Sequence, residues 1–129
     1  MKPIPAVFVG TWRISSMELW SAADIDLDGP AELRLSRNGQ GTMRFLAVEA
    51  DLDCEPSEAG NIVEFSWVGT DDCDMRSGRG WVKHDGSSGL QGRFFFHLGD
   101  ASGFKAVRTA LRTRPQRTSR ESRRRRTRR

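Results

Sequence analysis

The sequence has few cysteines, no long apolar run and no complete motif for catalysis, metal binding or cofactor binding. Its two cysteines, Cys54 and Cys73, are too few for a disulfide framework in a chain of 129 residues, which is long enough to build one hydrophobic core. We therefore expect free thiols, with a disulfide as the alternative. Pro3 and Pro5 interrupt the apolar stretch near the N-terminus, which argues against a signal peptide and a transmembrane segment. These absences predict a cytoplasmic protein with no cofactor, no metal and no membrane partner.

The sequence also has no stretch that keeps the 3.6-residue apolar period of an amphipathic helix. Apolar and polar residues instead alternate in short runs separated by turn-forming residues. This pattern predicts an all-β domain over residues 1–107, either a small antiparallel meander barrel or a strongly curved sandwich of about seven or eight strands. Pairing of sequential strands would bring the last beside the first and close the ring. The expected strands are residues 10–14, 31–35, 42–54, 62–68, 78–84, 90–98 and 103–107.

Several segments fit this pattern less regularly. Residues 15–24 suit either a bent continuation of the first strand or a helical turn, and we predict the strand. Residues 24–28 alternate Asp with Ile and Leu; we interpret them as the acidic face of an edge strand and not as a calcium loop, because Leu35 stands where that loop requires Glu. A change in the apolar alternation within residues 42–54 predicts a bulge. Residues 70–77 predict an acidic loop.

Charge is divided sharply between the body and the C-terminal segment. Residues 108–129 hold 11 of the 21 basic residues and one of the 17 acidic ones, which leaves residues 1–107 with a net charge of −6. The C-terminal segment has too little apolar surface to fold, so we predict a disordered tail. Its arginines predict non-specific attachment to RNA or DNA, with folding back onto the acidic body and an incidental extension as alternatives. The densest group is Arg123, Arg124, Arg125 and Arg126.

Residues 93–98 form the densest apolar run, and its alternation predicts a central strand that is apolar on both faces. Core packing accounts for most of the four Trp and seven Phe, and the remainder would line a barrel mouth. The alternation places Phe94, Phe96 and Leu98 on one face and Phe95 and His97 on the other.

Polar residues gather at the end of this strand. His97, Asp100 and Ser102 have the residue types of a base, an acid and a nucleophile, but the segment lacks a Gly-x-Ser-x-Gly elbow, so no catalytic residue is assigned. Arg79 lies between two glycines, and we expect its guanidinium to reach a carboxylate such as Asp71 or Asp100. The predicted ligand-binding residues at the barrel mouth are Arg79, Trp81, His97, Asp100 and Ser102.

The sequence thus favours a small, non-enzymatic binding or interaction module whose partner is an unknown protein or small molecule. One alternative is a nucleic-acid-associated protein that acts through its arginine-rich tail. Another is a small hydrolase that uses His97 and Asp100.

Four blocks stand in order along the chain: Gly10-x-Trp12-Arg13-Ile14-x-x-Met17-Glu18-x-Trp20, Phe65-Ser66-Trp67-x-Gly69-x-Asp71, Ser77-Gly78-Arg79-Gly80-Trp81 and Gly92-x-x-x-Phe96-His97-x-Gly99-Asp100-x-Ser102-x-Phe104-x-Ala106. Together they resemble a widespread family of small, uncharacterised bacterial proteins, a resemblance that implies no activity. The chain differs from the family pattern at Cys73 and in its arginine-rich tail. The opening Gly10-x-Trp12 also resembles the first strand of lipocalin-like barrels, which implies only the barrel architecture.

Overall fold

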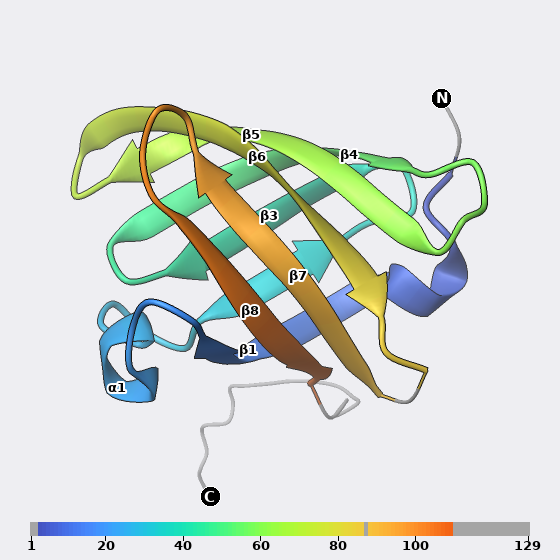
Figure 1. The fold of residues 1–129 in the computed structure, drawn as a ribbon, viewed down its shortest axis with the longest axis horizontal. Helices are drawn as coiled ribbons and strands as arrows, with labels where there is room; N and C mark the ends of the chain where they lie inside the picture. Colours follow the sequence, from blue (N-terminus) through green and yellow to red (C-terminus); the bar gives the residue numbers. More distant parts are fainter. Residues whose placement is uncertain (1–2, 87, 110–129) are drawn as a thin grey trace, which may run out of the picture.

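The computed structural model describes residues 3–86 and 88–109. Its strands are β1 (Gly10–Met17), β2 (Glu32–Leu35), β3 (Gln40–Phe45), β4 (Val48–Pro56), β5 (Ile62–Asp71), β6 (Asp74–His84), β7 (Gly89–Phe96) and β8 (Ala101–Arg108). Each strand pairs antiparallel with the next, and β8 returns to β1, so the sheet closes into a barrel (Figure 1). A 3-10 helix, η1 (Ala6–Phe8), precedes β1, and a short helix, α1 (Ala22–Ile25), connects β1 with β2. The predicted meander barrel is confirmed.

The first and last strands close the ring as expected. β1 and β8 pair from Trp12 opposite Arg108 to Met17 opposite Phe104, and the register shifts between Ile14 and Ser16. That irregularity bends β1, which allows a short strand to follow the curvature of a small barrel.

Arg108 belongs to the barrel, although its position at the start of the basic segment led the sequence prediction to assign it to the tail. It is the last residue of β8, and its guanidinium carbon lies 4.3 Å from the centroid of the Trp12 ring. Its two terminal nitrogens donate to the carbonyl oxygens of Val9 at 2.8 Å and Val7 at 3.0 Å. These contacts tie the N-terminal segment to the closing strand. Residues 110–129 of the predicted tail, which include Arg123, Arg124, Arg125 and Arg126, lie outside the described residues.

The barrel interior is filled by aromatic side chains. Trp67 stacks on Phe94 with ring centroids 4.6 Å apart, and Phe45 meets Phe94 edge to face at 5.0 Å. Gly80 makes room for another ring, that of Phe65, because a Cβ atom at position 80 would lie 2.4 Å from it. Burial of each large apolar side chain stabilises the fold by roughly 1.5 to 3 kcal/mol. The core interpretation of the aromatic residues is therefore confirmed for this cluster.

Helical segments cover the two ends of the barrel. Figure 1 shows η1 and α1 at opposite ends. At one end Ile4 and Phe8 are buried, and the indole N–H of Trp12 donates to the carbonyl oxygen of Phe8 at 2.9 Å. At the other end Ile25 is buried, and its carbonyl oxygen accepts the N–H of Leu46 at 2.9 Å. The open, aromatic-lined mouth that the sequence suggested is thus covered.

The bent strand predicted for residues 15–24 is correct only as far as Met17, and a helical turn follows it. β1 ends at Met17, and α1 begins after Ser21, whose hydroxyl accepts the N–H of Asp24 at 3.2 Å. Asp26 is not on an edge strand either. Its carboxylate accepts hydrogen bonds from the guanidinium of Arg13 at 2.7 Å and from the N–H of Ala31 at 3.0 Å. The short apolar alternation of residues 24–28 was too brief to separate a strand from a turn.

Within the described chain, no helix has the length and apolar character needed to cross a bilayer.

Two tight turns replace features that were predicted as a bulge and a loop. Residues 42–54 do not form one strand, because β3 and β4 are joined by a turn in which Leu46 has a φ of 51°. Residues 70–77 are not a loop, because β5 and β6 continue to a turn at Asp72 and Cys73, with φ of 51° and 75°. Neither turn contains the glycine that usually marks positive φ. Asp72 is a residue type that tolerates this conformation, whereas Leu46 and Cys73 give no local sign of a turn.

Both cysteines are free thiols, as expected, with Cys54 buried and Cys73 exposed. Burial, together with the nearby Asp53 carboxylate, raises the pKa of Cys54 to about 12. The Cys54 thiol is therefore protonated at neutral pH and behaves as a small apolar core residue.

Candidate functional site

A groove of about 660 Å³ lies on the outer wall of the barrel where β7 turns towards β8. It forms because β6 extends beyond its neighbour: β7 pairs with β6 only as far as Phe96 opposite Gly78, while β5 accompanies β6 to Asp74. The turn after β7 rests on this extension through the N–H of His97, which donates to the carbonyl oxygen of Ser77 at 2.8 Å. We call this feature the Arg79 groove; residues 66–68, 77–79 and 95–99 line it.

Arg79 provides the positive charge of the groove. It is exposed on β6, opposite Phe95 on β7, and its guanidinium carbon lies 4.1 Å from the centroid of the Phe95 ring. The predicted ion pair with Asp71 or Asp100 is wrong, because among the described residues no carboxylate lies within ion-pair distance of Arg79. Stacking on an aromatic face leaves the N–H donors at the edge of a guanidinium available to an acceptor.

The polar lining of the groove contains no negative charge. Besides Arg79 it includes His97 and the hydroxyl-bearing Ser66 and Ser77, and neither Asp nor Glu lines it. This composition contrasts with the net charge of −6 on residues 1–107. The groove therefore carries a local positive charge on an acidic body, although Arg79 also borders a neighbouring hollow that is lined by Asp53, Glu55 and Glu64.

Large apolar side chains are exposed at this end of the barrel. Leu98 is 94% exposed and Val68 is 58% exposed, and both line the groove; Met75, which is 77% exposed, lies nearby on β6. Leu98 also has a φ of 57°, in the left-handed region that costs a non-glycine residue roughly 1 to 2 kcal/mol. An exposed leucine in this conformation contributes nothing to the core.

The exposure of Leu98 corrects the sequence prediction, which placed it on one strand face with Phe94 and Phe96. β7 ends at Phe96, so His97 and Leu98 lie in the turn and no longer follow the strand alternation. The Gly99-Asp100 pair marks a turn in the sequence, but the turn begins two residues before it.

The other predicted ligand-binding residues do not share this groove. Trp81 follows Arg79 on the outer face of β6, half-buried and opposite Arg93, and contributes to the neighbouring wall. Asp100 is exposed in the turn, and its carbonyl oxygen accepts the N–H of Phe96 at 2.9 Å. The structure thus brings together Arg79 and His97 but not the whole predicted set.

Ser102 faces the interior of the fold. It is 1% exposed, its hydroxyl donates to the carbonyl oxygen of Gly103 at 2.9 Å, and its oxygen accepts the N–H of Leu19 at 3.2 Å. Ser102 does not line the Arg79 groove. The structure therefore does not assemble Ser102 and His97 in one open pocket, which the hydrolase alternative requires.

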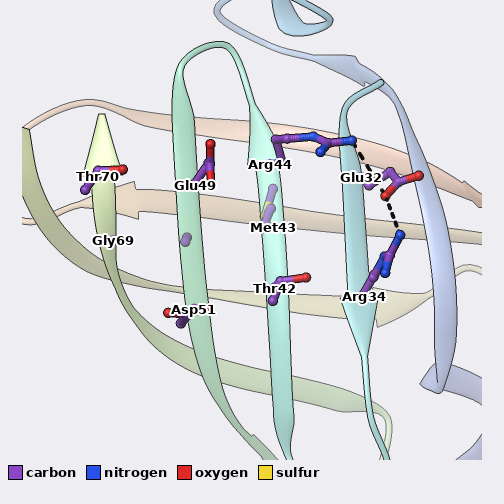
Figure 2. Close-up of a pocket in the computed structure, with 10 residues that line it drawn as sticks. Glu32, Arg34, Thr42, Met43, Arg44, Glu49, Asp51, Gly69 and Thr70 are labelled. Atoms are coloured by element: carbon purple, nitrogen blue, oxygen red, sulfur yellow. Dashed lines mark hydrogen bonds and ion pairs between the residues drawn. The ribbon is translucent and has the colours of Figure 1, made fainter. Parts of the chain in front are cut away.

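A second hollow of about 460 Å³ lies on the wall over β2 to β5 (Figure 2). Figure 2 shows Glu32 between two arginines, with its carboxylate 3.3 Å from Arg34 and 3.9 Å from Arg44. Glu49 and Asp51 of β4 stand beside this network. The cations of this hollow therefore already have an acidic partner, unlike Arg79.

In the part of the chain that the structure describes, no group of three or more His, Cys, Asp or Glu side chains is arranged to hold a metal ion. A scan against protein-family models, a search of curated proteins and a search of solved structures find no match to this chain. Function must therefore be argued from the geometry of the site.

Proposed function

We propose that the protein is a non-enzymatic binding module and that the Arg79 groove is its binding surface. The observation that carries this proposal is an exposed arginine held over an aromatic ring with no carboxylate partner among the described residues. The free thiols of Cys54 and Cys73 favour action in a reducing compartment such as the cytoplasm.

Two other arginines of the barrel show what a structural ion pair looks like. Arg13 pairs with Asp26, and Arg93 lies 3.2 Å from Glu18. Those contacts link separate segments of the fold, whereas the contact of Arg79 with Phe95 joins only adjacent strands that are already paired. A positioned cation that adds little to the fold is better explained by binding of an anionic group.

Fluorescence of 8-anilinonaphthalene-1-sulfonate, a probe with an anionic group and an apolar body, tests this proposal. We expect saturable binding to the full-length chain and clearly weaker binding to Arg79→Ala. Arg37→Ala is the matched control, because Arg37 is an exposed arginine in the turn between β2 and β3. Equal binding by Arg79→Ala and the unmodified protein would exclude the groove as the binding surface.

A second candidate function is association with nucleic acid through the tail. The observation that favours it is the ten arginines within residues 109–129, attached to residues 1–108, whose net charge is −5. Replacement of Arg123, Arg124, Arg125 and Arg126 by Gln alters no residue of the barrel strands and should reduce retention of RNA or DNA at low salt. Unchanged retention would contradict this function.

A further inference from the structure

We propose that the Arg79 groove docks an extended segment of a partner protein in which a carboxylate lies next to large aliphatic side chains. This inference rests on the proposed binding function and specifies the class of partner.

The charges around the groove favour one local negative charge over a polyanion. Arg79 offers a fork of N–H donors that matches a carboxylate. On the neighbouring strand β4, Asp53 is the partner of Ser66 and Asp51 is the partner of Val68, so exposed carboxylates border the β5 side of the groove. A nucleic acid backbone carries a row of negative charges that these carboxylates would repel, whereas a single Asp or Glu side chain that enters from the β7 side meets a lining without carboxylates.

The apolar surface favours aliphatic neighbours of that carboxylate. Val68 and Met75 lie diagonally across the β5–β6 pair, because Val68 is opposite Ser77 and Met75 is opposite Thr70. Leu98 approaches from the turn after β7 and also lines the groove. These side chains are exposed to solvent, so their burial against a partner would contribute to affinity.

The backbone of β6 favours an extended peptide over a small molecule. The carbonyl oxygen of Ser77 accepts the N–H of His97, so the backbone groups of Ser77 face the β7 side. Strand geometry alternates with each residue, so the N–H and C=O of Met75 face the same side, beyond the end of β7 at Phe96. An extended chain can hydrogen-bond to this short length of sheet edge while its side chains reach the groove.

A random peptide display library, selected on the immobilised full-length chain at physiological salt, tests the inference. We expect enriched peptides to carry Asp or Glu within a few positions of Leu, Ile, Val or Phe. A fluorescently labelled peptide of this kind should bind Arg79→Glu about tenfold or more weakly, because a charge-assisted hydrogen bond is replaced by repulsion. Leu98→Ser should also weaken binding, whereas Arg37→Glu should bind like the unmodified protein.

The variants separate groove binding from attraction of acidic peptides to the arginine-rich tail. Peptides that lack an acidic residue, or that bind Arg79→Glu as tightly as the unmodified protein, would overturn the inference. A selection without enrichment, combined with Arg79-dependent binding of 8-anilinonaphthalene-1-sulfonate, would overturn the peptide assignment and leave the proposed binding function in place. If neither peptide binding nor binding of 8-anilinonaphthalene-1-sulfonate depends on Arg79, the peptide assignment and the proposed binding function are both excluded.

Discussion

Arg79 and Phe95 stand opposite each other on β6 and β7, with the guanidinium carbon 4.1 Å from the ring centroid. The ring restricts the position of the guanidinium without neutralising it. Phe95→Leu removes the π face and keeps an apolar side chain, so we expect binding of 8-anilinonaphthalene-1-sulfonate to weaken two- to fivefold, equivalent to about 0.5 to 1 kcal/mol. Fluorescence titration measures the effect, and unchanged affinity would show that the ring does not position Arg79.

The ion pair between Arg13 and Asp26 makes the stability of the barrel depend on pH. The hydrogen bonds from Arg13 and from the N–H of Ala31 lower the pKa of Asp26 from 3.8 to about 2. A lowered pKa means that the folded state favours the carboxylate, so its contribution is fully present above about pH 4 and is lost as the pH falls towards 2. Asp26→Asn should therefore be less stable than the unmodified protein at neutral pH, and this difference should shrink in acid.

Urea denaturation at a series of pH values measures this difference. Asp28→Asn is the matched control, because Asp28 is an exposed carboxylate in the same turn. A difference between Asp26→Asn and the unmodified protein that stays constant down to pH 2 would contradict the assignment.

The turn at Asp72 and Cys73 has positive φ at both residues, the geometry in which Asp-Gly is favoured. Cys73→Gly should therefore stabilise the protein, by several tenths to about 1 kcal/mol, since relief of the left-handed strain exceeds the added entropy of glycine in the unfolded chain. Cys73→Ala removes the thiol but keeps the Cβ atom, so it should change little. Urea denaturation of both variants provides the measurement, and a less stable Cys73→Gly would refute this interpretation of the turn.

The two thiols should differ in reactivity. Cys73 is exposed, whereas burial raises the pKa of Cys54 to about 12, so Cys54 presents almost no thiolate at neutral pH. We expect 5,5′-dithiobis(2-nitrobenzoate) to react promptly with Cys73 in the native protein and with both thiols in denaturant. Cys73→Ser should abolish the prompt native reaction. A prompt reaction that persists in Cys73→Ser would show that the barrel opens at Cys54.

The barrel could be predicted from the sequence because one face of most strands is buried. β4 shows the principle most clearly, since Val48, Ala50, Leu52 and Cys54 are buried and the residues between them are exposed. Alternation of this kind specifies which side chains enter a core, and a series of such strands with short connections favours closure.

The turns were harder to predict than the strands. Leu46 and Cys73 adopt positive φ without being glycine or asparagine, because the pairing of long flanking strands holds each turn in place. Such turns depend on tertiary pairing and have no local marker. The end of β7 at Phe96 is a similar case, and it explains why Leu98 was predicted to continue the strand.

The candidate site was predictable in part. Arg79 and His97 could be selected because their residue types are suited to binding an anion, and the structure places them in one groove. The position of that groove was not predictable, because it depends on β6 extending beyond β7. Ser102 is a different case. Its hydroxyl lies next to a turn and was interpreted as available to a ligand, but it is hydrogen-bonded within the fold.

The most direct test of the proposed binding surface is a map of amide chemical shifts in the isotopically labelled full-length chain during titration with 8-anilinonaphthalene-1-sulfonate. Binding at the Arg79 groove predicts the largest shifts at residues 66–68, 77–79 and 95–99, together with a shift of the Arg79 Nε–H. Shifts concentrated instead around Arg34 and Arg44, or confined to the arginine-rich tail, would contradict it.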